Sequence, residues 1–418
     1  MPDAKLSVES AVSAFGLEAK AKLSAIAAKG QPEDQLRNPL EQLVAAMTEL
    51  CGQVRSKLAL IGESSLSELH TRPDFAVSYA NALIGFIEVK APGKGADPRR
   101  FKDPHDKAQW KKLAALPNLI YTDGNSFALW RDGNRVGEVQ RLDGDIETSG
   151  AALRPSTGLL ALFDAFLKWS PIPPNTPRQL AQTSARLCRL LRDEVAEQLD
   201  RGDKTLTGLA NDWRHLLFPG ASNAQFADGY AQVVTFGLLL AREQGISLDG
   251  GVGAAAKKLS GSNSLIGYAL RALTDSVVQE AVLPTSVGTL GRVLSVVDWP
   301  TVSKGNPEAW LYFYEEFLAE YDNALRKQTG SYYTPVEVVK PMTRMVNEAL
   351  HDRFGFTDGL ANPSVTLVDP AMRTGTFLLE VGYGQDKHET HSGPASPCVE
   401  ALARPRRRVW PPEGLPVL

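Results

Sequence analysis

Two acidic residues and one lysine lie around two short apolar runs of the sequence. Asp74 opens the first run, and Glu88 and Lys90 close the second. Side chains alternate between the faces of a strand, so Glu88 and Lys90 share one face while Val89 points into the core. Two carboxylates and an ammonium at a sheet edge could hold a hard divalent cation and activate a water molecule.

A β-hairpin is the element that would bring these side chains together. Residues 75–80 and 83–90 are rich in β-branched and aromatic residues and flank Asn81-Ala82, which is typical of a hairpin. Closing this hairpin brings Asp74 close to the face that carries Glu88 and Lys90. Further elements are expected around it: a helix over 8–29, a helix that Pro39 begins, a strand near 58–61, a helix over 105–113 and a second hairpin over 118–130 that turns at Asp123-Gly124-Asn125. They predict a compact α/β unit.

The segment from Lys94 to Lys112 is the densest basic stretch of the chain. Its cations are Lys94, Arg99, Arg100, Lys102, Lys107, Lys111 and Lys112. Such a run is typical of a solvated loop and helix face. Its position directly after the candidate site also favours contact with the DNA backbone, because Lys and Arg provide most phosphate contacts. Both interpretations stay open.

Length and composition limit the classes of protein. The 418 residues predict two or three domains, and 43% hydrophobic with 22% charged residues is ordinary for a globular protein. No apolar stretch is long enough for a membrane span, and the N-terminus does not have the pattern of a signal peptide. Three distant cysteines form neither a disulfide framework nor a zinc pattern, so we expect a cytoplasmic protein. The net charge of −3 means that any nucleic-acid site must come from local charge.

The C-terminal part changes character twice. Helical patterns dominate residues 151–320, and a helix is expected over 336–350. Residues 365–370 then predict a strand that leads through a loop with Gly375 into a helix, which is the layout of a nucleotide-type cofactor site. Residues 382–418 contain six prolines and no apolar periodicity, so we expect a disordered tail, from a shifted reading frame or a truncated gene product.

The pattern Pro73-Asp74…Glu88-Val89-Lys90 resembles the PD-(D/E)XK nuclease superfamily. The following Gln109 helix is similar to the version found at the N-terminus of single-chain restriction-modification enzymes. This resemblance implies Mg²⁺-dependent hydrolysis of double-stranded DNA by Asp74, Glu88, Lys90 and Gln109, with Mg²⁺ bound by Asp74 and Glu88. A glutamate on a preceding helix often joins such sites; Glu41 and Glu63 are the candidates, and Glu41 is preferred because it lies on a predicted helix.

A second stretch resembles the N6-adenine DNA methyltransferase domain of the same enzymes. It consists of Tyr333-Thr334-Pro335 and of Asp369-Pro370-Ala371 followed by Thr374-Gly375-Thr376-Phe377. The resemblance implies that these residues lie at S-adenosylmethionine. Arg373 stands where the family has a glycine, and a side chain there should obstruct the close approach of backbone and cofactor. The family's Asn-Pro-Pro-Tyr motif is absent from the sequence, so we expect no methylation by this chain.

These resemblances imply an α/β protein with a PD-(D/E)XK nuclease-like domain, a mostly helical spacer and an incomplete Rossmann-like methyltransferase start. The expected bounds are 1–150, 151–320 and 321–381, with the tail at 382–418. The leading hypothesis is a truncated restriction-modification protein in which only the nuclease site is complete. One alternative is a catalytically dead DNA-binding fragment of a DNA methyltransferase. Another is a nuclease-fold binding module whose Asp, Glu and Lys form only a surface ion pair. The oligomeric state stays open.

Overall fold

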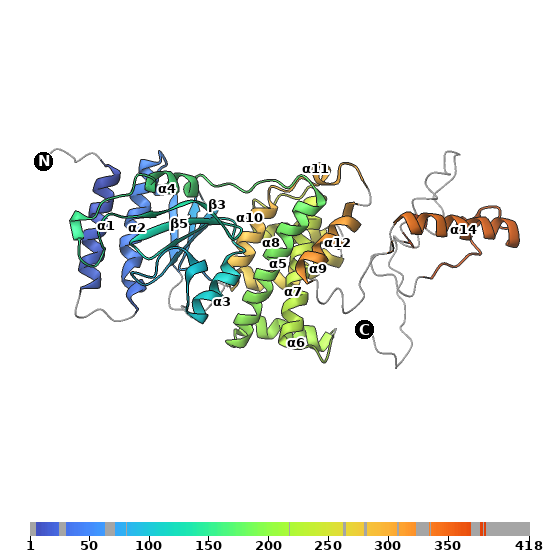
Figure 1. Cartoon of the computed structure of the whole chain (residues 1–418). Coiled ribbons are helices and arrows are strands. Elements are labelled where there is room, and N and C mark those ends of the chain that lie inside the picture. Colours follow the sequence, from blue (N-terminus) through green and yellow to red (C-terminus); the bar gives the residue numbers. More distant parts are fainter. Residues whose placement is uncertain are drawn as a thin grey trace. The chain divides into compact units, whose positions relative to one another are not determined.

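The computed structural model describes residues 6–24, 31–62, 72–80, 82–216, 218–261, 265–279, 282–306, 309–322, 334, 336–368, 377–378 and 380–381. The chain divides into two compact units, residues 1–321 and residues 322–418 (Figure 1). None of the helices within these ranges is long and apolar enough to cross a membrane.

A six-stranded mixed sheet forms the N-terminal layer of the first unit (Figure 1). Its strands keep the chain order in space: β1 (Leu58–Gly62), β2 (Phe75–Tyr79), β3 (Ala82–Val89), β4 (Leu119–Thr122), β5 (Ser126–Arg131) and β6 (Asn134–Arg141). The β3–β4 pair is parallel, and the other neighbouring pairs are antiparallel. A parallel pair needs a crossover connection, which contains helix α3 (Pro104–Leu113).

Both predicted hairpins are confirmed. β2 and β3 pair antiparallel, but Ala82 already pairs with Tyr79, so the turn begins at Ala80 (φ 49°), one residue before the predicted Asn81-Ala82. β4 and β5 pair antiparallel around Asp123-Gly124, where Gly124 has a φ of 79°. Strand β6 was not expected: it follows a further turn at Asp132-Gly133, and its half-exposed residues lack the apolar run of a buried strand.

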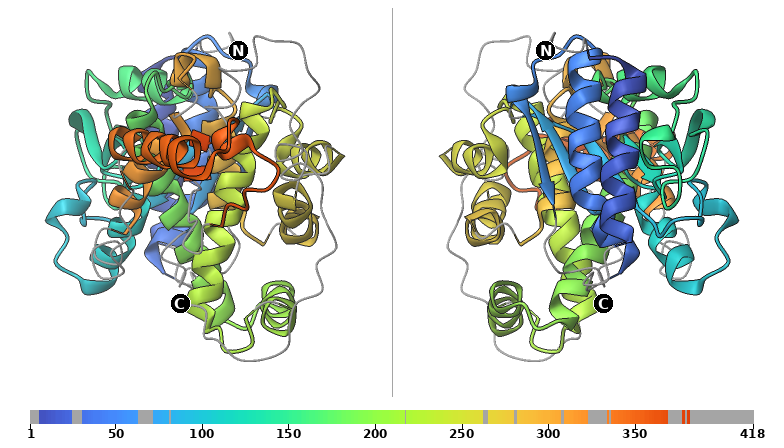
Figure 2. Two further views of the ribbon diagram at one scale, coloured as in Figure 1. Left: turned by 90° about the vertical axis from the view of Figure 1, so that its right-hand side faces the viewer. Right: turned by 90° about the vertical axis from the view of Figure 1, so that its left-hand side faces the viewer.

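Helices cover both faces of the sheet. α1 (Val8–Leu23), α2 (Pro32–Leu50) and α4 (Leu159–Leu167) share one core with the strands, and Figure 2 shows α1 and α2 side by side across this face. On the other face, a second core joins strand residues to α3 and to Leu190 of α5 (Pro177–Asp200). Strand β3 is therefore buried on both sides, which explains its nearly continuous apolar sequence.

Two helix predictions need correction. The helix expected over 8–29 ends at Leu23 within the described residues, and residues 25–30 lie outside them. The next helix does not begin at Pro39, which lies inside α2. It begins at Pro32, where a proline costs no helical hydrogen bond, and Asp34 accepts a hydrogen bond from the Gln31 N–H at 3.2 Å.

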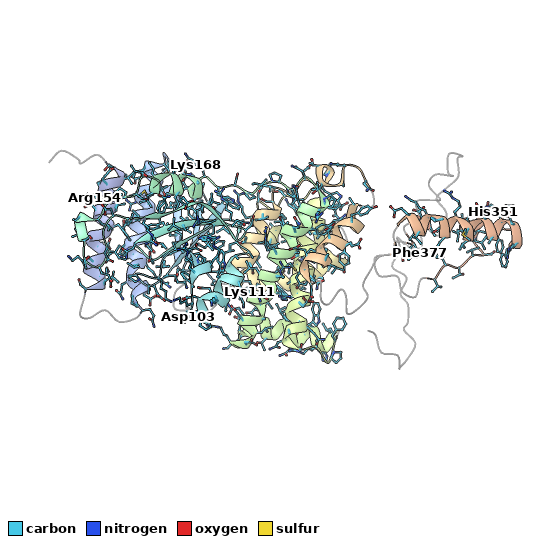
Figure 3. All side chains as sticks on the ribbon, in the orientation of Figure 1. Asp103, Lys111, Arg154, Lys168, His351 and Phe377 are labelled. Carbon is cyan, nitrogen blue, oxygen red and sulfur yellow. The ribbon has the colours of Figure 1, made fainter. Side chains whose placement is uncertain are left out.

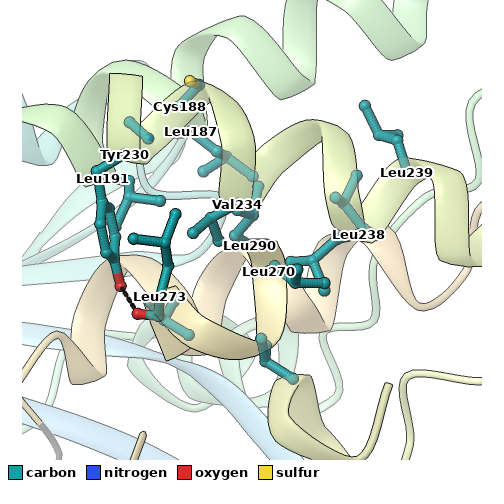
Figure 4. Packing of buried hydrophobic residues seen from close by; sticks show 14 of the residues in the cluster. Leu187, Cys188, Leu191, Tyr230, Val234, Leu238, Leu239, Leu270, Leu273 and Leu290 are labelled. Atoms are coloured by element: carbon teal, nitrogen blue, oxygen red, sulfur yellow. Dashed lines mark hydrogen bonds between the residues drawn. The ribbon is translucent and has the colours of Figure 1, made fainter. Parts of the chain in front are cut away.

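Helices alone build the rest of the first unit. They are α5, α6 (Lys204–Leu216), α7 (Asn223–Glu243), α8 (Gly251–Gly261), α9 (Leu265–Gln279), α10 (Pro284–Leu294), α11 (Trp299–Ser303) and α12 (Ala309–Tyr321). They enclose one large apolar core (Figure 4). Its buried Tyr230 hydroxyl donates a hydrogen bond to the Leu273 carbonyl at 3.0 Å, which satisfies the polar end of that side chain.

The second unit is described mainly by helix α14 (Val336–Phe354) and a short 3₁₀ turn at Gly359–Ala361. The helix expected over 336–350 is confirmed, and it extends to Phe354. Residues 365–368, predicted as a strand, have no strand structure. A strand requires a hydrogen-bonded neighbour, and the described residues of this unit contain no other strand.

Candidate active site

Asp74 lies immediately before β2, and both of its carboxylate oxygens have partners. Oδ2 accepts a hydrogen bond from the Val89 N–H at 2.8 Å, and Oδ1 pairs with Arg37 Nη2 of α2 at 2.8 Å. The hairpin therefore brings Asp74 against the end of β3, as the alternating pattern of the two strands predicts. Burial raises the pKa of Asp74, while the Val89 N–H and the Arg37 charge oppose this shift.

Glu88 lies at the end of strand β3, Lys90 follows its last residue, and the two side chains point to the same side of the sheet. Their side chains are buried, and Lys90 Nζ lies 2.9 Å from Glu88 Oε1. Val89 between them belongs to the core on the opposite face, which confirms the predicted alternation. The N–H of Lys90 donates to the Thr122 carbonyl at 2.7 Å, so β4 holds the backbone under the pair.

Helix α3 supplies two further partners for Lys90. Its ammonium donates to Gln109 Oε1 at 2.5 Å and lies 3.1 Å from Asp106 Oδ1. Gln109 was predicted at the site, but Asp106 was not. Residues three apart share a helix face, so the spacing of Asp106 and Gln109 is a signal that could have identified the acid.

The site holds charge in a buried environment. Burial, followed by the charge of Asp74, raises the pKa of Glu88 to about 8, and the Lys90 charge opposes this shift. Burial lowers the pKa of Lys90, but the Glu88 and Asp106 carboxylates outweigh it and the net shift is upward. The lysine is therefore held as an ammonium, and Glu88 is a carboxyl whose ionisation needs a further cation or a rise in pH.

Glu88 also has an unsatisfied atom. Its Oε2 is buried without a hydrogen-bond partner, unlike Oε1, which faces Lys90. A buried carboxylate oxygen without a partner is costly, and a cation would satisfy it. However, the described residues contain no group of three or more His, Cys, Asp or Glu side chains placed to hold a metal ion, so the structure by itself does not support the Mg²⁺ prediction.

A second glutamate of α2, Glu33, is influenced by the charges of this site. Burial raises the pKa of Glu33 on α2, and Lys90 and Asp74 are among the charges that influence it. Glu33 and Glu41 each lie about one helical turn from Arg37, which contacts Asp74, so Glu41 stays a prediction. Glu63 lies outside the described residues. Glu33 is not among the candidates from the sequence because it lies before Pro39, where no helix is expected.

The residues predicted at S-adenosylmethionine are described only in small part. Thr334 is exposed and has no regular structure, and Phe377 is half-buried in a short helical stretch of the second unit (Figure 3). The others lie outside the described residues: Tyr333, Pro335, Asp369, Pro370, Ala371, Thr374, Gly375 and Thr376. The same holds for Arg373, so the geometry of this second predicted site is not described.

Comparison with known proteins supports the methyltransferase resemblance. Residues 311–393 match the family model described as N-6 DNA methylase, which confirms the similarity predicted near the C-terminus. Among solved structures, a chain from a cryo-electron microscopy structure of a DrdV–DNA complex matches with 20% sequence identity and a TM-score of 0.34. The match covers 90% of this chain and 35% of that chain, so this chain spans about a third of its length. No curated protein matches.

Proposed function

We propose that the sheet layer of this protein is a PD-(D/E)XK-type nuclease centre that hydrolyses phosphodiester bonds in double-stranded DNA with Mg²⁺. One observation carries the proposal: Asp74, Glu88 and Lys90 converge at the end of β3, where Glu88 has a buried oxygen without a partner. The antiparallel hairpin, the crossover through α3 and the parallel strand β4 provide the framework that this motif requires.

Asp74 and Glu88 are the residues that would hold the ion, together with the Val89 carbonyl. Mg²⁺ is commonly bound through one or two carboxylates, waters and substrate phosphates, so a third protein carboxylate is not required. When bound, the ion would make water more acidic and neutralise charge on the phosphate. Lys90, held by Gln109, would orient the attacking water or stabilise the charge that develops on the phosphate.

A plasmid-nicking assay tests this proposal. Wild-type protein should relax supercoiled plasmid in Mg²⁺ or Mn²⁺, and Asp74→Ala and Lys90→Ala should not. Lys168→Ala is a matched control, because that lysine lies at the surface in an ion pair with Asp164 and should leave nicking unchanged. The absence of nicking by the wild type with either ion, with or without S-adenosylmethionine, would refute the nuclease proposal.

The match of residues 311–393 to an N-6 DNA methylase model favours a second candidate function. In this alternative the chain is a DNA-binding protein of the adenine-N6 methyltransferase lineage, in which Arg373 prevents use of S-adenosylmethionine, and the Asp74 site is an ion pair only. Binding to duplex DNA without nicking would favour this alternative. Nicking abolished by Asp74→Ala would favour the combination of nuclease and methyltransferase segments found in restriction-modification enzymes.

A further inference from the structure

The ammonium of Lys90 has an acceptor for each of its N–H bonds. It lies 2.9 Å from Glu88 Oε1, 3.1 Å from Asp106 Oδ1 and 2.5 Å from Gln109 Oε1. A lysine ammonium has three donors, so these contacts use its whole capacity. A water or phosphate oxygen can bind Lys90 only if one of these acceptors releases it. The chemistry of the site therefore depends on which of the three acceptors keeps its hydrogen bond to Lys90 and which one releases it.

Asp106 connects Lys90 to the protein surface. Its side chain is 4% exposed, and its second oxygen, Oδ2, lies 2.7 Å from Lys94 Nζ. The Lys94 side chain is 43% exposed, whereas that of Lys90 is 8% exposed. One buried carboxylate thus holds two ammonium groups, one inside the site and one that solvent can reach. Burial raises the pKa of Asp106, but the hydrogen bond from Lys94 and the charge of Lys90 outweigh it, and the carboxyl stays ionised.

Lys94 lies in a surface that suits an anionic polymer. The same segment exposes several other cations: Arg99, Arg100, Lys102, Lys107 and Lys111. Figure 3 shows Lys111 and Asp103, on and just before α3, at this surface. A polyanion that meets such a surface competes with local carboxylates for the exposed ammonium groups. For Lys94 the competing carboxylate is Asp106.

We propose that Asp106 is a positioning residue that keeps Lys90 in the site, and that Lys94 leaves Asp106 to contact a backbone phosphate of duplex DNA. This inference rests on the proposed nuclease function. In the free protein, Lys94 and Lys90 share the carboxylate. When a phosphate binds Lys94, Asp106 pairs with Lys90 alone. Asp106 and Gln109 then hold the ammonium of Lys90 in place, and Glu88 becomes free to bind the metal. Contact with DNA at the surface is thereby coupled to the arrangement of the buried lysine.

Binding of a short duplex in EDTA tests the coupling without any cleavage. Asp106→Asn releases Lys94, so we expect affinity to rise about threefold to fivefold beyond the rise given by Asp103→Asn. Asp103→Asn is a matched control, because it removes the same charge from the same helix start, and asparagine retains the cap that Asp103 provides to the His105 N–H. The additional gain should vanish when Lys94→Gln is also present.

Lys94→Gln provides an independent measurement, since this surface substitution should not impair folding. It should reduce the slope of log affinity against log salt by about one, as loss of one phosphate contact does. An equal gain from Asp103→Asn and Asp106→Asn, a gain that persists without Lys94, or an unchanged salt slope would overturn the coupling. So would a wild type that does not bind the duplex.

A cleavage measurement tests the positioning role. Under single-turnover conditions at saturating duplex, Asp106→Asn should slow cleavage about tenfold or more although it does not weaken DNA binding. Asp106→Glu, which keeps the charge, should recover part of the rate. A loss of affinity with an unchanged rate would refute positioning. If the wild type binds DNA but does not cleave it, the nuclease proposal fails, while the binding measurements still decide whether Lys94 and Asp106 are coupled.

Discussion

Asp74 Oδ2 accepts a hydrogen bond of 2.8 Å from the backbone N–H of Val89, the residue between Glu88 and Lys90. The carboxylate before β2 is thus positioned by the backbone at the end of β3, and its other oxygen is paired with Arg37. The spacing of the candidate site depends on the register of one hairpin. A change at any of these groups affects both stability and the site.

Asp74→Ala should lower the free energy of unfolding by about 1–3 kcal/mol, because it leaves the Val89 N–H and Arg37 without this acceptor. Asp74→Asn retains an oxygen for the Val89 N–H and should cost less. Urea unfolding in EDTA measures both. Equal stability of Asp74→Ala and the wild type would contradict the importance of these hydrogen bonds.

Mg²⁺ affinity should depend on pH through Glu88. Because its pKa is raised to about 8, the carboxyl is largely protonated below that pH, and a metal ion must displace the proton. Affinity should therefore rise about tenfold per pH unit as pH increases toward 8 and level off above it. Calorimetric titrations in two buffers of different ionisation enthalpy would show proton release near neutral pH. An affinity that is independent of pH would contradict the assignment, and Glu88→Gln should abolish the dependence.

Arg72→Met should destabilise the protein by about 3–5 kcal/mol, since it leaves a buried carboxylate without its cation. Arg72 Nε lies 3.0 Å from Glu194 Oε1, and the two side chains are 7% and 0% exposed. Arg271→Gln is the control: it breaks an exposed pair with Asp275 and should cost less than about 1 kcal/mol. Chemical unfolding that gives equal losses for both variants would show that burial does not set the cost.

Gly85→Ala should destabilise the protein by about 1–3 kcal/mol through overpacking in β3. A Cβ at Gly85 would lie 2.6 Å from the Asn118 carbonyl oxygen and 2.7 Å from a Phe166 ring carbon. Gly208→Ala on α6, where a Cβ meets nothing within 4 Å, should instead stabilise by up to about 1 kcal/mol. Thermal unfolding of both variants distinguishes tight packing at Gly85 from a general effect of alanine.

S-adenosylmethionine should not bind the wild-type chain measurably. Arg373 stands where the N6-adenine DNA methyltransferases that this stretch resembles have a glycine. Its side chain should obstruct the approach of the cofactor to the backbone. Arg373→Gly should restore at least weak binding in a calorimetric titration. Saturable binding by the wild type would show that the loop accommodates the arginine.

The side-chain directions of neighbouring site residues can be predicted from the sequence, because side chains alternate between the two faces of a strand with a period of only two residues. Glu88, Val89 and Lys90 take the faces that a period of two residues requires. The second hairpin turns where Asp123-Gly124 interrupts two apolar runs, whereas the first turn begins one residue before the predicted Asn81-Ala82. Gln109 was found through family resemblance. Asp106, three residues earlier, cannot be distinguished in the sequence from a surface acid of a charged helix. Only the structure shows that it contacts Lys90.

The remaining features depend on contacts between distant residues. Arg72 and Glu194 are 122 residues apart, and neither carries a local pattern that predicts its partner. Glu33 comes under the influence of the Lys90 and Asp74 charges because α2 begins before Pro39, where the helix signal of the proline is ambiguous. Residues 365–368 have the apolar character of a strand, but strand formation also needs a neighbouring strand.

The buried Arg72–Glu194 pair holds the sheet against the helices without help from the peptide segment that joins them. Residues 168–176 join α4 to α5, and Ile172 in this link is 86% exposed. Beyond Arg72, Arg186 pairs with Asp132 at 2.9 Å and Lys112 pairs with Glu197 across the same boundary. Protease cleavage within 170–176 should therefore give two fragments that co-purify, and we expect them to separate only when the protein is unfolded.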